Sequence, residues 1–138
     1  MRILVYISIC FLFFSCSNSE KKIDQNLIDN GAEISIVGDE NINFGKIVQG
    51  EKVDLVFRIK NTGVGYLKIS DKTTVSCGCT QLEYPKELIK PGDEENISVT
   101  FDSKNRLGLQ KKNITLVTNA TPSIKMLTIE GMVLPSEN

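Results

Sequence analysis

The chain has no histidine and no tryptophan among its 138 residues. Histidine is the commonest general base and the commonest side-chain metal ligand, so its absence excludes histidine-dependent triads and histidine-bound zinc sites within this chain. The missing tryptophan excludes the buried tryptophan that marks antibody domains. These absences predict a protein that is not an enzyme and carries no cofactor.

The chain also lacks an excess of either charge. It has 16 Lys+Arg against 17 Asp+Glu residues, and the basic residues do not gather in one block. Nucleic-acid binding depends largely on clustered cations that neutralise phosphates. Nucleic acid is therefore not an expected partner.

No apolar run reaches the roughly 20 residues that a membrane-spanning helix needs. The run at residues 3–14 follows Arg2 and precedes Ser15-Cys16. This order resembles the leader of bacterial lipoproteins, in which a small residue precedes the cysteine that receives the lipid. Phe13 departs from that pattern, which usually has an aliphatic residue there. The sequence predicts lipidation of Cys16, with an ordinary cleaved leader or a retained anchor as alternatives.

Lipidation of Cys16 implies a protein of the bacterial cell envelope that acyl chains hold at a membrane. In some bacteria an Asp after the lipidated cysteine retains the protein at the inner membrane. Ser17 occupies that place, so the outer membrane is expected rather than the inner. We assign residues 1–15 to a lipoprotein signal peptide, residues 16–31 to a flexible polar tether and residues 32–138 to one folded domain.

Short alternations of apolar and polar residues dominate the folded part and predict β-strands. Residues 53–59 and 97–101 alternate in this way, apart from Val56, which falls on the polar face. Turn-forming residues at 61–65 precede a strand expected from 66 to 75. About seven such strands predict an all-β antiparallel sandwich, with a small closed barrel as the competing arrangement.

Six segments of the folded part stand in an order that is typical of one family. They are Phe44–Glu51, Phe57–Gly63, Val75–Thr80, Ile89–Gly92, Ile97–Asp102 and Gly131–Val133. Together they resemble the bacterial family named domain of unknown function 1573, over about residues 40–134. The resemblance implies an immunoglobulin-like antiparallel β-sandwich of about seven strands, akin to Hydin-type and major-sperm-protein-like modules. Many members are envelope lipoproteins, and the family has no settled biochemical activity.

Cys77 and Cys79 are the only free thiols of the mature chain if Cys10 leaves with the leader and Cys16 carries lipid. They must bond to each other, stay reduced, hold a metal or bridge to another molecule. Residues i and i+2 of a strand lie about 6.6 Å apart at Cα, near the upper limit of roughly 6.8 Å for a disulfide. A bond between the two cysteines therefore needs a bent backbone, which Gly78 permits.

A soft metal ion such as copper(I) is the sharper alternative for this cysteine pair. Met126 or Met132 could add a thioether ligand, although core packing in the final strand is the preferred role of both. Zinc would need two more ligands, and no histidine can supply them.

Four basic residues flank an expected hairpin near the C-terminal third of the chain and are predicted to form a solvated rim. They are Lys104, Arg106, Lys111 and Lys112.

Taken together, the sequence predicts a membrane-anchored envelope lipoprotein that acts as a non-enzymatic binding or structural module. Its expected partners are the membrane, through the lipid, and an envelope protein or glycan bound at a face or an edge strand of the sandwich. The alternative is a thiol redox or soft-metal (copper) handling protein that works through Cys77 and Cys79.

Overall fold

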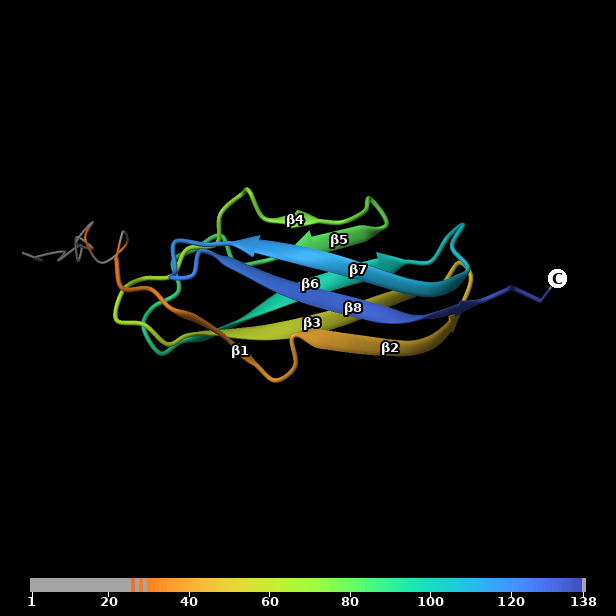
Figure 1. The fold of residues 1–138 in the computed structure, drawn as a ribbon, viewed down its shortest axis with the longest axis horizontal. Coiled ribbons are helices and arrows are strands. Elements are labelled where there is room, and N and C mark those ends of the chain that lie inside the picture. The colour runs from red at the N-terminus through yellow and green to blue at the C-terminus, as the bar shows by residue number, and fades with distance from the viewer. Residues whose placement is uncertain (1–25, 27, 29, 138) are drawn as a thin grey trace, which may run out of the picture.

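The computed structural model describes residues 26, 28 and 30–137, and its eight strands form two four-stranded sheets packed face to face (Figure 1). The first sheet has the order β1-β3-β6-β5, formed by Ile34–Val37, Lys52–Asn61, Glu94–Asp102 and Thr80–Glu83. The second has the order β2-β8-β7-β4, formed by Asn41–Val48, Ile124–Leu134, Gly108–Val117 and Thr74–Val75. These orders correspond to the A-B-E-D and C-F-G sheets of an immunoglobulin-like sandwich. The predicted fold is confirmed.

The core lies between the two sheets and is built by alternate residues of the long strands. Phe57, Ile97 and Phe101 are buried from the first sheet, and Leu116 and Ile129 are buried from the second. Side chains at neighbouring positions point to the other face, because successive strand residues alternate. Burial of these apolar side chains is the main force that holds the sheets together.

The N-terminal strand is divided between the two sheets, which the prediction of a purely antiparallel sandwich missed. β1 pairs with β3, the chain crosses at Gly38 (φ +103°), and β2 then continues in the other sheet beside β8. Because β2 and β8 run in the same direction, this pair is parallel. A bulge between Asn43 and Lys46, with Gly45 at φ +75°, interrupts their register.

The strand predicted from residues 66 to 75 is wrong as a continuous element. Leu67 and Ile69 form only isolated bridges, and β4 begins at Thr74. A turn separates the two parts, because the backbone N–H of Thr73 donates to the carbonyl oxygen of Ser70 at 3.0 Å. The alternation of apolar and polar residues ends at Ile69, and the four polar residues Ser70 to Thr73 form the turn.

The last residues of the expected tether contact the domain at the end where the chain enters it. The carbonyl oxygen of Gly31 accepts hydrogen bonds from the backbone N–H groups of Val64 at 2.8 Å and Gly65 at 2.9 Å. The side-chain amide of Asn119 donates to the carbonyl oxygen of Ile28. The predicted signal peptide and Cys16 lie outside the described residues. Among the residues that the structure describes, no helix has the length and apolar character to cross a membrane.

Candidate functional site

The cysteine pair lies at a corner where the chain passes from one sheet to the other. β4 ends at Val75 on the edge of the second sheet, and β5 begins at Thr80 on the edge of the first. Between them, Cys77 and Cys79 form a disulfide with a Cα–Cα distance of 5.3 Å. This distance is shorter than the roughly 6.6 Å of an extended strand, so the backbone is bent here. The N–H of Thr80 closes the bend by donating to the Cys77 carbonyl oxygen at 3.2 Å.

Hydrogen bonds fix both sides of this corner. The N–H of Ser76 donates to the carbonyl oxygen of Asn113, and the N–H of Asn113 donates to the Ser76 hydroxyl, each at 3.0 Å. On the other side, the N–H of Asp102 donates to the Cys79 carbonyl oxygen at 2.9 Å. The disulfide therefore joins two segments that are themselves held to β7 and β6.

Both cysteines are half-buried, and one hydroxyl lies close to their sulfur atoms. Thr80 Oγ1 is 3.5 Å from Cys77 Sγ and 4.0 Å from Cys79 Sγ. Cys79 also packs against the hydrophobic core. Because a disulfide sulfur carries no thiolate charge, this corner can act chemically only after reduction or thiol exchange.

Neither methionine of the metal alternative lies beside the cysteine pair in the strand register. Met132 is opposite Leu109, and Met126 is opposite Thr115 on the same strand pair. The expectation that Met126 and Met132 pack in the core is wrong, because both lie on the outer face of β8, where Met126 is 53% exposed and Met132 is half-buried. Across residues 26, 28 and 30–137, no group of three or more His, Cys, Asp or Glu side chains is placed to hold a metal ion.

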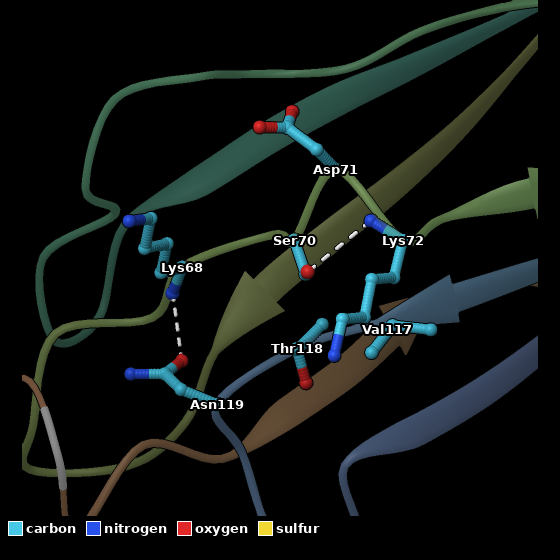
Figure 2. Close-up of a pocket in the computed structure, with 7 residues that line it drawn as sticks. All are labelled: Lys68, Ser70, Asp71, Lys72, Val117, Thr118 and Asn119. Atoms are coloured by element: carbon cyan, nitrogen blue, oxygen red, sulfur yellow. Dashed lines mark hydrogen bonds between the residues drawn. The ribbon is translucent and has the colours of Figure 1, made fainter.

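A shallow hollow of about 450 Å³ lies at the tether-proximal end, beside the turn that precedes β4 (Figure 2). Backbone and side-chain hydrogen bonds shape it: the N–H of Lys68 donates to Asn119 Oδ1 at 2.7 Å, and the N–H of Lys72 donates to the Ser70 hydroxyl at 3.2 Å. Figure 2 shows the Lys72 side chain extending toward Thr118. The sequence did not predict this hollow, because Lys68, Ser70, Asp71 and Lys72 fall within the strand expected from 66 to 75. The lining residues are Lys68, Ser70, Asp71, Lys72, Val117, Thr118 and Asn119.

Asp71 is already engaged at the rim of this hollow. Lys86 Nζ donates to Asp71 Oδ1 at 2.9 Å and lies 3.9 Å from the centroid of the Tyr84 ring. The hydrogen bond and charge of Lys86 lower the pKa of Asp71 below its ordinary value of 3.8. Tyr84, and then Asp71, raise the pKa of Lys86. The rim of the hollow therefore carries an ion pair between Asp71 and Lys86, and the Asp71 carboxylate is not free.

Comparison with known proteins identifies the domain by its sequence and its shape. The family model described as protein of unknown function DUF1573 matches residues 34–133. A solved protein of unknown function from Porphyromonas gingivalis W83 is 15% identical, with a TM-score of 0.63 over 73% of this chain and 46% of that chain. The ASH/PapD-like domain 7 of human CEP192 is 13% identical, with a TM-score of 0.58 over 89% of this chain and 98% of that domain.

The VesB protease of Vibrio cholerae shows a further likeness, at 16% identity and a TM-score of 0.55, over 79% of this chain and 33% of the protease. The chain thus spans less than half the length of the Porphyromonas protein and a third of the Vibrio protein. At these identities the structural likeness shows the fold alone. No curated protein matches the sequence.

Proposed function

Because this chain belongs to the DUF1573 family and its matched region forms an immunoglobulin-like sandwich, we propose that it is a lipid-anchored, non-enzymatic binding module of the bacterial cell envelope. In this proposal Cys16 carries the lipid, and the sandwich presents an edge strand to an extended segment of an envelope protein. The observation that carries the proposal is the open backbone of β5.

The direction of the β5 backbone groups follows from one hydrogen bond. The bond from Asp102 N–H to the Cys79 carbonyl oxygen marks these two residues as a hydrogen-bonded pair of the antiparallel β5–β6 ladder. Such pairs alternate, so Thr80 and Leu82 direct their backbone groups away from β6. The Thr80 N–H is bonded to the Cys77 carbonyl oxygen, whereas the outward N–H and C=O of Leu82 make no hydrogen bond within the described part of the chain. An added strand could pair with these groups.

The edge that β2 forms on the second sheet is protected against such pairing. On β2, the N–H of Gly45 is bonded to Asn43 Oδ1 and the N–H of Val48 to Glu51 Oε2, each at 2.7 Å. Side-chain capping and the bulge of β2 are ways in which proteins block edge-to-edge association. β1 is the remaining regular edge, but it follows the tether directly. β5 is farther along the chain and is held in place by the disulfide corner.

Site-specific crosslinking in intact cells tests the binding surface. We expect a photoreactive residue at Gln81, on β5, to form an adduct with an envelope protein. The substitution Leu82→Pro removes the outward N–H and should abolish the adduct, whereas Ile36→Pro on β1 is the matched control and should leave it intact. An adduct that survives Leu82→Pro would exclude strand addition at β5.

Fatty-acid labelling tests the anchor independently. We expect a metabolically incorporated fatty acid to label the chain and the label to be lost in Cys16→Ser. Labelling that persists in this variant would show that the lipid is attached to a residue other than Cys16.

A second candidate function is thiol exchange at Cys77 and Cys79. The observation that favours it is the half-burial of both cysteines, which leaves the disulfide within reach of a small thiol. If this function is correct, the double substitution Cys77→Ser/Cys79→Ser should abolish exchange with a glutathione redox buffer and change the cellular phenotype. A folded double variant that behaves as wild type in cells would exclude it.

A further inference from the structure

Apolar side chains gather at one end of the outer face of the second sheet. Strand register places Val48 opposite Leu134 and Leu109 opposite Met132. Leu107 lies just before the first residue of β7, two positions before Leu109. Leu109 is 74% exposed and Leu107 is 55% exposed. We call these five residues the distal patch, because they lie at the end of the sandwich from which the C-terminus leaves, away from the entry of residue 30 (Figure 1).

A small depression gives the distal patch an uneven surface. Asn43, Gly45, Lys46, Leu109, Gly131 and Met132 surround a hollow of about 240 Å³. Gly131 must lack a side chain, because a Cβ there would overlap the ring of Phe44 in the adjacent strand. The missing side chain of Gly131 thus leaves room for Phe44 on the core side of β8, while Leu109 and Met132 lie beside the hollow on the outer face.

Three unpaired cations surround the distal patch. Lys46, Lys104 and Arg106 are exposed, and no salt bridge is present for any of them in the described structure. Of the nearby carboxylates, Glu130 pairs with Lys111 at 3.8 Å and Asp102 pairs with Lys52 at 3.7 Å. Glu51, which accepts a hydrogen bond from the N–H of Val48, has no salt bridge in the described structure. Lys104 and Arg106 of the predicted solvated rim thus border an apolar surface, and with Lys46 they outnumber the unpaired carboxylate of Glu51.

This combination favours a lipid surface over a protein partner. Protein–protein interfaces are enriched in aromatic residues, methionine and arginine and depleted in lysine, and leucine and valine are under-represented among their hot spots. The distal patch contains no aromatic residue and one methionine; its other four residues are leucine or valine, and two of its three bordering cations are lysines. Aliphatic burial at the boundary of the acyl chains, with cations against anionic headgroups, is the chemistry of peripheral membrane contacts.

We propose that the distal patch and its three cations form a second membrane-contact site, which docks the domain onto an anionic phospholipid surface independently of the lipid on Cys16. Leu107 and Leu109 insert among the acyl chains near the headgroups. Lys46, Lys104 and Arg106 contact the phosphate groups.

Vesicle flotation tests this proposal with a chain that begins at Ser17, which lacks the lipid acceptor and keeps every described residue. The probes are vesicles of phosphatidylethanolamine with phosphatidylglycerol, and vesicles of phosphatidylcholine alone. We expect binding to the anionic vesicles that weakens with added salt, and little binding to the neutral ones. Leu109→Asp should lower the binding constant by at least about tenfold, since it removes a buried leucine from the bound state. Lys46→Glu/Arg106→Glu should lower it by about tenfold or more.

Val56→Asp is the matched control, because Val56 is 53% exposed on the outer face of the other sheet. It should bind as wild type, and the melting temperatures of all variants should show that they are folded. Equal binding to neutral vesicles, or equal losses in Val56→Asp and Leu109→Asp, would overturn the proposal. So would a lack of vesicle binding together with a crosslink from Leu109 to an acidic envelope protein, which would assign the patch to a protein partner. Because every tested chain lacks Cys16 and keeps β5 unchanged, these outcomes are independent of the proposed anchor and of the proposed binding edge.

Discussion

At the scale of single residues, Asn61 connects three segments at the tether-proximal end of the sandwich. Its side chain is fully buried. The amide nitrogen donates to the carbonyl oxygens of Gly65 at 2.8 Å and Ile89 at 3.0 Å, and the amide oxygen accepts from the N–H of Gly63 at 3.1 Å. The side chain therefore satisfies the Gly65 carbonyl and the Gly63 N–H, and it adds a second donor to the Ile89 carbonyl, which already accepts from the N–H of Leu67 at 2.9 Å.

We expect Asn61→Ala to lower the free energy of unfolding by about 2–4 kcal/mol, because the Gly65 carbonyl oxygen loses its donor and the Gly63 N–H loses its acceptor, whereas the Ile89 carbonyl keeps the N–H of Leu67. Urea denaturation of the chain that begins at Ser17 measures this change. Asn96→Ala, at an exposed position of β6, is the control and should change the value by less than about 0.5 kcal/mol. A loss below about 1 kcal/mol for Asn61→Ala would show that water replaces the amide.

The exposed pair of Asp71 and Lys86 gives a second prediction. Lys86 lowers the pKa of Asp71 through a hydrogen bond and its positive charge. Lys86→Ala should therefore raise the pKa of Asp71 toward 3.8, as measured by NMR titration of the side-chain carboxyl group. The lowered pKa means that the pair contributes to stability above about pH 4 and loses that contribution as the pH falls through the lowered value. An unchanged titration would show that the pair does not persist in solution.

At the scale of elements, the disulfide corner between β4 and β5 closes a very small loop. Closing three residues constrains the unfolded chain only modestly, so Cys77→Ser/Cys79→Ser should lower the free energy of unfolding by about 1–2 kcal/mol. Urea denaturation with an unchanged slope should show this shift, and reductant should have the same effect on the wild type. A loss above about 4 kcal/mol would mean that the corner stabilises far more of the sandwich than its own loop.

The elements that the sequence predicted well are those in which one face is buried along a regular strand. Phe57, Ile59 and Ile97 alternate with polar residues and are buried, and Val56 is exposed as its place in the pattern required. The same rule places Met126 on the outer face, since it alternates with Leu127 and Ile129. The prediction assigned Met126 to the core instead, because methionine commonly packs in protein cores. The pairing of β2 with β8 could not be predicted from local patterns, because it joins residues far apart in the sequence.

The cysteine site shows the same division between features that are visible in the local sequence and features that depend on the whole fold. The motif around Cys77 and Cys79 was visible in the sequence, and so was the need for a bend at Gly78. The partners that fix the bend, Asn113 and Asp102, come from strands whose proximity depends on the whole fold. The hollow beside Lys72 was missed because Ser70 and Asp71, which favour turns, were included in one strand from 66 to 75.

At the scale of the whole molecule, most strand pairs join distant parts of the chain. β2 and β8 bring residues 41–48 against residues 128–134, and β1 and β3 are separated by all of β2. Such long-range pairing slows folding, because a large loop must close before the contacts form. We expect refolding of the chain from Ser17 in milliseconds to seconds, measured by stopped-flow fluorescence of its tyrosines. Complete refolding within microseconds would contradict this expectation.

The parallel arrangement of β2 and β8 also determines how the domain responds to mechanical force. A pull between the tether end and the C-terminal end draws β2 toward its own beginning and β8 toward its own end. Because the two strands run side by side in one direction, this load is directed along them as shear, and the hydrogen bonds between them share it. A hairpin pulled apart from its open end loses its bonds one after another. The divided N-terminal strand thus gives the sandwich a mechanical clamp between its two ends.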